Sequence, residues 1–354
     1  MGFQNQDDWE IVAKSDFIDW KRFENKTIFV TGATGLIGFN LVHSLVYVNN
    51  KYDLGMKIFA LVRDEERAKK RFFDCANDHV LDFIVGSVEN LPEITEPIHY
   101  IVHGATPTSS KAFVDKPVET IKTSVIGTAN VLELARKKNI EGMVYLSSME
   151  IYGLPSKGTK VSESQIGTFS PNNVRNSYPI GKLESESLCK AFSSEYGIPV
   201  CSARLTQTFG SGVNYDDGRI FAYFGRCIAE KQNIVLKTTG ETERCYLYTA
   251  DAVTAILKLL LDGEEGAAYN VADESTYCSI AEMAAEIAKR YGISVKYDVQ
   301  DTAKNGFPDT LYMDLDTSRL KELGWKCQVH DAVGKLGVLD LFELMVLHCF
   351  RIKK

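Results

Sequence analysis

The sequence predicts an α/β protein: a doubly wound, mostly parallel sheet with a smaller, interleaved C-terminal α/β portion. Short apolar strands alternate with helical segments over about 120 residues, which specifies a parallel sheet covered by helices on both faces. Glycines follow the first strand at every third position. The chain of 354 residues, 45% hydrophobic and 25% charged, is long and apolar enough for one large domain and a smaller appendage.

The segment Lys26–Gly38 organises the rest of the chain. Its apolar run 28–30 is typical of a buried parallel strand, and Gly32, Gly35 and Gly38 follow. Apolar residues then recur with helical period at Leu36, Ile37, Leu41, Val42, Leu45 and Val46. A strand that turns on glycines into a helix presents free N–H groups and the positive end of the helix dipole, which bind anions. Such glycines also let the backbone approach a pyrophosphate, so the segment predicts a Rossmann-type dinucleotide-binding unit.

Further strands and helices are expected along the chain. The strands are at residues 57–62, 83–85, 98–102, 143–147, 200–205 and 234–237, and the helices at 118–138, 177–196, 220–230 and 251–261. Ligands of such sheets bind beyond the carboxyl ends of the strands, so Thr31, Arg63, His103 and Ser147–Ser148 are expected in one crevice. We divide the chain into an N-terminal extension (1–25), a dinucleotide-binding domain (26–205) and a mainly substrate-binding portion (206–354) with segments that return to the first domain.

Composition excludes several classes of protein. The net charge of −7 and the lack of a dense Lys/Arg run argue against a nucleic-acid partner. No apolar run reaches transmembrane length, residues 1–20 do not read as a signal peptide, and segment 338–350 predicts a terminal helix packed on the body or on a partner subunit. The eight cysteines show no C-x-x-C spacing, so we expect reduced thiols in a cytoplasmic protein without a metal site.

Tyr178 and Lys182 are spaced i and i+4, which places them on one helix face. A phenol with a pKa near ~10 acts as a base at neutral pH only if a cation stabilises its phenolate. Lys182 supplies such a cation, and Ser148, at the end of a predicted strand, supplies a hydroxyl that holds the substrate oxygen. A chance spacing of a surface Tyr and Lys is the alternative interpretation.

On these residues, the chain resembles an extended short-chain dehydrogenase/reductase of the NAD(P)-dependent nucleotide-sugar epimerase/dehydratase family. The resemblance extends from about Lys26 to Trp325. It rests on the motifs Thr31–Gly38, His103–Thr106, Gly127-Thr128, Leu146–Gly153, Tyr178-x-x-x-Lys182, Arg204–Gly210 and Arg244–Asp251.

The resemblance implies a role for each motif. Tyr178 is the acid/base, Lys182 binds the nicotinamide ribose and Ser148 orients the sugar 4-oxygen, in a reaction that begins with hydride removal from sugar C4. The implied cofactor-binding residues are Gly32, Thr34, Gly35, Leu36, Ile37, Gly38, Arg63, Ser87, Gly104, Ala105, Thr106, Tyr178 and Lys182. The implied substrate-binding residues are Thr108, Ser148, Gln207 and Arg244. The family also implies a homodimer formed by helices 118–138 and 177–196.

Three positions depart from the family pattern. Arg63 replaces the acidic residue that holds the ribose 2′-hydroxyl in NAD-preferring members, and Lys69–Arg71 lie nearby to meet a 2′-phosphate. This favours NADP slightly, while tightly bound NAD stays open. Ser87 stands where the family often has Asp near the adenine, and Gln207 stands where an Asn commonly meets the substrate phosphate.

Glu150, two places after Ser148, carries information about the reaction. A carboxylate there could remove the proton at C5 once C4 is a ketone, because the carbonyl acidifies its neighbour. Met149 cannot protonate a leaving 6-hydroxyl, which puts full dehydration in doubt. A structural role for Glu150 is the alternative. Arg244 is expected to grip the diphosphate, or a sugar carboxylate, and a plain surface arginine is its alternative.

The leading functional prediction is therefore an NAD(P)-dependent enzyme that remodels a nucleotide-diphosphate sugar through a 4-keto intermediate. Epimerisation, decarboxylation and dehydration remain open. The alternative is an NADPH-dependent reductase of a keto-sugar or another carbonyl compound. A catalytically idle nucleotide-binding protein is disfavoured, because Ser148, Tyr178 and Lys182 are all present.

Overall fold

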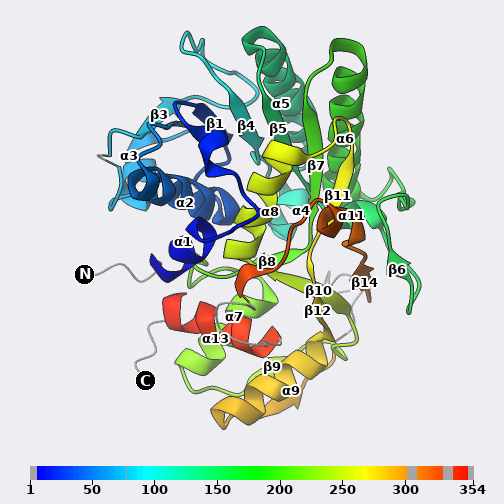
Figure 1. Ribbon diagram of the computed structural model, residues 1–354. Coiled ribbons are helices and arrows are strands. Elements are labelled where there is room, and N and C mark those ends of the chain that lie inside the picture. Colours follow the sequence, from blue (N-terminus) through cyan, green and yellow to red (C-terminus); the bar gives the residue numbers. More distant parts are fainter. Residues whose placement is uncertain (1–5, 77, 301–308, 330–337, 350–354) are drawn as a thin grey trace.

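Seven parallel strands form the central sheet of the molecule (Figure 1). The structure is a computed structural model and describes residues 6–76, 78–300, 309–329 and 338–349. In spatial order the strands are β11 (Ala268–Val271), β7 (Val200–Leu205), β5 (Gly142–Ser148), β4 (Tyr100–His103), β1 (Thr27–Thr31), β2 (Lys57–Val62) and β3 (Leu81–Val85). The chain runs outward from β1 in one direction and then from β4 in the other. This reversal opens a crevice at the carboxyl ends of β1 and β4, as the sequence predicts.

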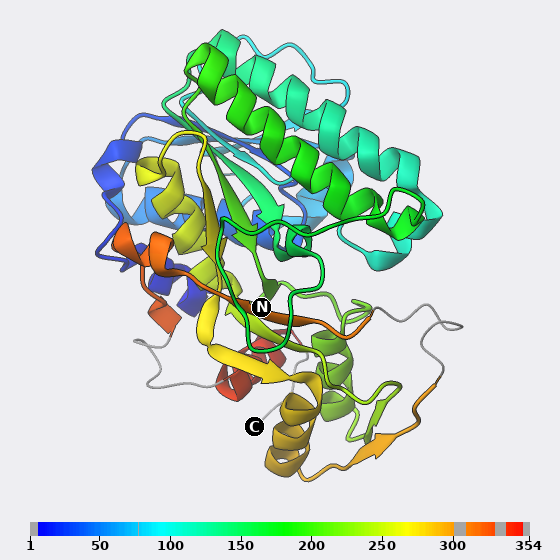
Figure 2. The ribbon, with the colours of Figure 1, turned by 90° about the vertical axis from the view of Figure 1, so that its right-hand side faces the viewer.

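Helices cover both faces of this sheet, which confirms the doubly wound fold class. The α-helices are α1 (Gln6–Ala13), α2 (Leu36–Tyr52), α3 (Glu65–Arg71), α4 (Ser110–Asp115), α5 (Pro117–Lys138), α6 (Ser177–Tyr196), α7 (Ile220–Ala229), α8 (Thr249–Asp262), α9 (Ile280–Tyr291), α11 (Ser318–Glu322) and α13 (Val338–Cys349). Short 3-10 helices are η1 (Trp20–Phe23), η2 (Met149–Tyr152) and η3 (Val174–Asn176). Figure 2 shows α5 and α6 side by side on one face, while α2 and α8 pack on the other.

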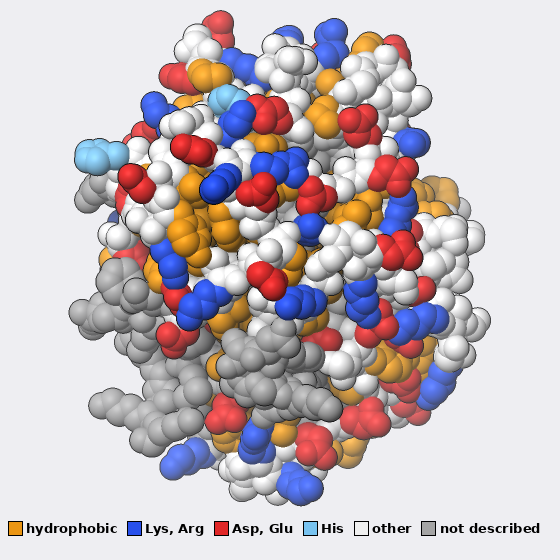
Figure 3. All heavy atoms as spheres, in the orientation of Figure 1, with side chains coloured by type: hydrophobic (Ala, Val, Ile, Leu, Met, Phe, Trp, Pro, Cys, Tyr) orange, Lys and Arg blue, Asp and Glu red, His pale blue; other side chains and the backbone are white. Residues whose placement is uncertain are grey.

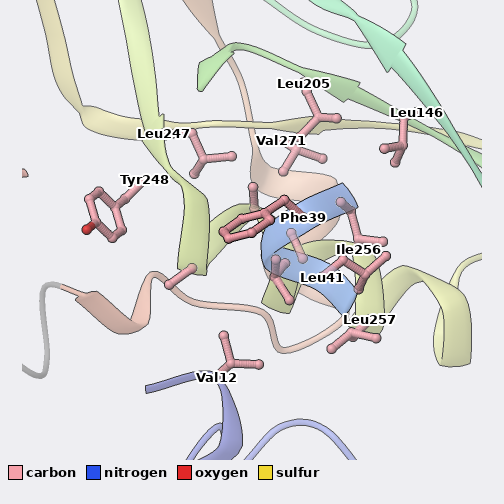
Figure 4. Packing of buried hydrophobic residues seen from close by; sticks show 14 of the residues in the cluster. Val12, Phe39, Leu41, Leu146, Leu205, Leu247, Tyr248, Ile256, Leu257 and Val271 are labelled. Carbon is pink, nitrogen blue, oxygen red and sulfur yellow. The ribbon is translucent and has the colours of Figure 1, made fainter. Parts of the chain in front are cut away.

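Alternate residues of each central strand face opposite layers. Ile28 and Val30 of β1 belong to the core under α2 and α8, whereas Phe29 belongs to the core under α5 and α6. Both faces of β1 are buried, which is why its sequence is a continuous apolar run. In the first core, Val12, Phe39 and Ile256 come together from α1, α2 and α8 (Figure 4).

A smaller sheet lies beyond the carboxyl ends of the central strands. Its order is β12 (Asp273–Ser279), β10 (Glu243–Tyr248), β14 (Tyr312–Leu315) and β6 (Lys160–Val161), and β8 (Gln207–Phe209) also pairs with β10. A two-stranded sheet joins β13 (Val295–Tyr297) to β9 (Ile234–Leu236). The chain forms β8 and β10, returns to the large sheet with β11, and leaves it again with β12. The C-terminal α/β portion is thus interleaved with the central sheet, and the domain boundary at residue 205 stays a prediction.

Most expected elements occur where the sequence places them, with shifts at their ends. The strand expected at 98–102 is β4, which begins at Tyr100 because its pairing with β1 begins opposite Ile28. The strand expected at 83–85 starts earlier, at Leu81, which pairs with Ile58. The apolar C-terminal segment forms α13, and its Phe342 packs on the rings of Phe209 and Phe224. This confirms that the helix packs on the body of the protein.

Candidate active site

A cavity of about 2070 Å³ opens at the carboxyl ends of the central strands. The cofactor-binding and substrate-binding residues implied by the resemblance all line it, and so do Ser148, Glu150, Tyr178 and Lys182. Its walls come from the turn after β1, the ends of β2, β4 and β5, the loop 153–176, and parts of α4, α6, β8 and β10. Part of the wall therefore belongs to the central sheet and part to the smaller portion.

The glycine turn is packed so tightly that side chains would not fit. Gly32 has a φ of +70°, and a Cβ there would lie 2.5 Å from the Gly104 carbonyl oxygen. A Cβ on Gly38 would lie 2.3 Å from the Gly32 carbonyl oxygen. Gly35 precedes α2 without a side-chain cap, so the first N–H groups of α2 face the cavity. This backbone cradle fits a pyrophosphate group.

His103 does not join the crevice, contrary to our expectation. It is fully buried, and its Nδ1 lies 2.7 Å from Thr31 Oγ1 while its Nε2 lies 3.0 Å from Thr128 Oγ1. Burial lowers its pKa to about 3, so the ring is neutral. Thr31 Oγ1 accepts hydrogen bonds from the N–H groups of Gly104 and Ala105 at 3.2 Å each. His103 therefore fixes the loop that lines the cavity and does not contact a ligand itself.

Ser148, Tyr178 and Lys182 meet in the cavity wall, as the sequence predicts. Lys182 Nζ donates hydrogen bonds to the Leu146 carbonyl oxygen at 2.6 Å and to Thr106 Oγ1 at 3.1 Å. Burial lowers the pKa of Lys182 to about 7. Burial raises the pKa of the Tyr178 phenol above its ordinary value, the Glu150 carboxylate raises it further, and a hydrogen bond with Ser148 lowers it. The phenol thus needs a nearby cation before it can act as a base near neutral pH.

Glu150 lies in η2, directly after β5 and beside these residues. Its backbone N–H donates to Ser148 Oγ at 3.2 Å. Its carboxylate forms an ion pair with Arg175, with Oε2 2.8 Å from Nη2, and its side chain is 31% exposed. The carboxylate therefore lies in the cavity wall, is partly exposed and acts electrostatically on the Tyr178 phenol, so it is available as a general base.

Comparisons with known proteins agree with this arrangement. Residues 28–272 match the model of the NAD dependent epimerase/dehydratase family. The chain belongs to this family. UDP-glucuronic acid decarboxylase 6 from Arabidopsis thaliana is 30% identical over 315 residues, which are 86% of this chain and 85% of the relative.

Solved structures of other proteins share the fold of this chain at lower sequence identity. An epimerase from Methanothermobacter thermautotrophicus has a TM-score of 0.77 at 20% identity, covering 94% of this chain and 95% of that one. UDP-glucuronic acid 4-epimerase from Bacillus cereus, solved with UDP-glucuronic acid and NAD, has a TM-score of 0.74 at 18% identity. That match covers 91% of this chain and 98% of the other.

Fewer basic side chains lie at the end of β2 in the cavity than the sequence suggests. Arg63 lines the cavity, and the neighbouring Asp64 caps α3 by accepting a hydrogen bond from the Arg67 N–H at 2.9 Å. Arg71 turns away: its guanidinium stacks 3.9 Å from the Phe39 ring centroid and donates to the Gly212 carbonyl oxygen. Lys69 pairs with Glu65 on its own helix. Arg71 therefore does not line the cavity, contrary to the expectation that it meets a 2′-phosphate, because Phe39 and Gly212 hold its guanidinium.

The far wall of the cavity carries Gln207 on β8 and Arg244 on β10, with Thr108 at the rim. The Arg244 Nε is buried and has no hydrogen-bond partner among the described residues. A buried guanidinium nitrogen without a partner is a donor available to an anionic ligand. Arg219, which the sequence analysis did not single out, lines the same cavity and pairs with Asp217.

Two further residues beside the catalytic set were missed by the sequence analysis, Arg175 in the cavity wall and Phe113 behind it. The Phe113 ring stacks on Tyr178, and the Arg175 guanidinium lies over Phe113 while it pairs with Glu150. The position of Arg175, three residues before Tyr178, is the one signal that could have suggested it. Phe113 gave no such signal, because α4 ends 62 residues before α6 begins. Only the contacts of α4 with η3 bring the two helices together in the fold.

Outside the cavity, His43, Asp74 and Cys75 bring potential metal ligands within 4.8 Å of one another. His43 Nε2 lies 2.9 Å from Asp74 Oδ1, and its ring stacks on Trp9 of α1. Burial raises the pKa of the Cys75 thiol to about 12, which disfavours the thiolate that a metal needs. We assign these residues a structural role in anchoring α1. All eight cysteines are free.

Two further features of the molecule are the hydropathy of its helices and the charge of its surface. Within the part of the chain that the structure describes, no helix combines the length and apolar character that a membrane span requires. The face in Figure 3 mixes acidic and basic side chains. Its described residues form no continuous basic stripe of the kind that holds nucleic acid.

Proposed function

We propose that this enzyme binds a nicotinamide dinucleotide and remodels a nucleotide-diphosphate sugar through a transient ketone at sugar C4. The observation that carries the proposal is that Ser148, Tyr178, Lys182 and Glu150 share one cavity with the glycine turn. Epimerisation and decarboxylation both fit this set. The reductase alternative rested on a basic cluster around Arg63, and two members of that cluster have other partners.

The residues present fit the cofactor. The backbone cradle at Gly32 and Gly38 leaves no room for side chains, and the N–H groups at the start of α2 suit a pyrophosphate. In this proposal Lys182 binds the nicotinamide ribose, and Arg63 binds the adenosine ribose or its 2′-phosphate. We propose NADP as the slightly preferred form because of Arg63. When bound, the nicotinamide supplies the acceptor and later the donor of a hydride.

The chain's own residues would move the protons. Ser148 holds the sugar 4-oxygen by a hydrogen bond, and the Tyr178 phenolate accepts the 4-hydroxyl proton as the C4–H bond breaks and the C=O bond forms. Protonated Lys182 stabilises the phenolate. Glu150 then removes the proton at C5, and the electron pair of the C5–H bond moves toward the C4 carbonyl. Arg244 and Gln207 would hold the diphosphate.

A panel of nucleotide sugars, screened by thermal shift, would first identify a ligand. The Glu150→Gln variant then tests the mechanism, because it keeps the shape of the side chain and loses the base. With the substrate in deuterated water, the parent enzyme should incorporate deuterium at C5, and the variant should not. The variant should still show the absorbance change of reduced nicotinamide on mixing, because hydride transfer precedes the action of Glu150.

A matched control is Glu119→Gln, which removes an exposed carboxylate from the same cavity rim. It should exchange deuterium at the parent rate. Normal turnover by Glu150→Gln, or no deuterium in the parent's product, would make Glu150 structural and favour simple C4 epimerisation.

A further inference from the structure

Arg175 is held in the cavity wall at both its backbone and its side chain. It lies in η3, where its backbone N–H donates to Asn173 Oδ1 at 3.0 Å. Its Nη2 donates to Glu150 Oε2 at 2.8 Å, and the two side chains are 30% and 31% exposed. Ser177, two residues later, donates its hydroxyl to the Phe113 carbonyl oxygen at 3.1 Å, which ties this segment to α4.

The same guanidinium also contacts the ring that covers the catalytic tyrosine. Its central carbon lies 4.8 Å from the Phe113 centroid. Phe113 in turn stacks on Tyr178, with centroids 4.2 Å apart and planes 10° apart. Arg175 therefore touches the carboxylate of Glu150 and the outer face of the Phe113–Tyr178 stack at once.

The charges of Glu150 and Arg175 act on the phenol in opposite directions. Burial and the Glu150 carboxylate raise the pKa of Tyr178, whereas the cations of Arg175 and Arg219 lower it. Arg219 already forms an ion pair with Asp217, which offsets its charge. Without Arg175, the Glu150 carboxylate would lose its ion-pair partner and only Lys182, 5.8 Å from the Tyr178 ring centroid, would offset its charge, so the phenolate would be harder to form.

We propose that Arg175 is a positioning residue that separates the two proton carriers. It fixes the Glu150 carboxylate and offsets its charge at the phenol, so that Tyr178 can lose its proton at neutral pH beside a charged base. Glu150 then acts as the base at the carbon next to the ketone. This inference rests on the proposed function, because it assigns Arg175 a task only if both groups carry protons.

The test compares Arg175→Gln, Arg175→Lys and a control, Lys111→Gln, in the cofactor-bound enzyme with a nucleotide sugar that the parent converts. Lys111 lines the same cavity from α4, is 86% exposed and lies 3.9 Å from Asp115. The readout is the pH dependence of the single-turnover rate of hydride transfer. Arg175→Gln should move the pH midpoint upward by about one unit or more, in the range that a lost neighbouring cation produces. Arg175→Lys should restore the midpoint, and Lys111→Gln should leave it unchanged.

A double variant shows whether Arg175 acts through Glu150. In the Glu150→Gln background the carboxylate charge is gone, so adding Arg175→Gln should move the midpoint less than it does in the parent background. An equal shift in both backgrounds would overturn the positioning role, as would a raised KM with an unchanged pH profile.

The two proposals fail in different ways. If the parent enzyme neither reduces its cofactor nor exchanges the C5 proton with any nucleotide sugar, the proposed function is wrong and the role of Arg175 falls with it. If the parent does both and Arg175→Gln keeps the parent pH profile, only the role of Arg175 is wrong.

Discussion

The phenol ring of Tyr178 lies face to face with the ring of Phe113, with centroids 4.2 Å and planes 10° apart. Phe113 is 1% exposed and comes from α4, a short helix whose contacts with η3 place it over the start of α6. The stack depends on the rings alone. Removing the hydroxyl of Tyr178 should therefore leave its position unchanged.

Tyr178→Phe should lower the rate of hydride transfer by roughly 10²–10⁴-fold, the usual contribution of positioned acid–base catalysis. The stack predicts that its melting temperature and cofactor content stay close to those of the parent. Stopped-flow absorbance with substrate measures the rate. Tyr196→Phe, an exposed tyrosine at the end of the same helix, is the control and should retain full activity. Retention of more than a tenth of the parent rate by Tyr178→Phe would contradict a proton-carrying role.

Lys182 should make the cofactor-free protein less stable on the acid side. In the unfolded chain its pKa is near ~10.4, and in the folded chain burial lowers it to about 7. Between these values the unfolded state binds a proton that the folded state lacks, so the free energy of unfolding rises with pH. Lys182→Met should therefore raise the melting temperature more at about pH 6 than at about pH 9.

Thermal unfolding of both proteins over that pH range, with cofactor removed, measures the difference. Lys190→Met, which removes an exposed lysine from the same helix, should show no such dependence. A constant difference between Lys182→Met and the parent at all pH values would show that the ammonium is not destabilised by burial.

Arg63→Asp should weaken binding of NADP much more than binding of NAD, because it replaces a cation with a charge that repels a 2′-phosphate. Isothermal titration with each cofactor gives the two affinities. Arg67→Asp makes the same change on a neighbouring exposed residue that does not line the cavity, and it should alter both affinities little. Equal losses for the two cofactors with Arg63→Asp would mean that Arg63 points away from the ribose.

We predict a homodimer through α5 and α6. Apolar side chains on α5 are exposed in the single chain: Val118 is 58%, Ile121 44% and Ile126 46% exposed. A second copy of the helix pair would bury this surface. Ile121→Glu should convert a dimer to a monomer by light scattering at micromolar concentration. Val299→Glu adds the same charge to an exposed apolar residue beyond β13 and should leave the dimer intact. A monomeric parent would rule the prediction out.

The sequence was enough to predict the central fold because each of its signals is local. The glycine turn, the apolar run of β1 and the helical spacing of Tyr178 and Lys182 can each be read within a few residues, and the structure places all of them at one cavity. Strand ends were less certain, as β4 shows, because they depend on which residue of a distant strand lies opposite.

Side-chain direction was the part that the sequence could not supply. His103 sits at a strand end and yet turns inward, because Thr31 and Thr128 offer it partners on the α5 side of the sheet. Arg71 was expected beside the cofactor, but Phe39 and Gly212 hold it elsewhere. Both outcomes depend on residues far away in the sequence. The same holds for Arg175, whose partner Glu150 is 25 residues earlier.

The first helix has a consequence for how the chain folds as it is made. Asp8 of α1 accepts hydrogen bonds from Ser211 and Tyr248, which come 203 and 240 residues later. A helix of eight residues is too short to be stable alone in water. On the ribosome, α1 can pack on α2 soon after both have emerged, because Trp9 stacks on His43, but Asp8 gains its last partner only when Tyr248 has been synthesised. The packing of α1 is thus completed late, although it can start early.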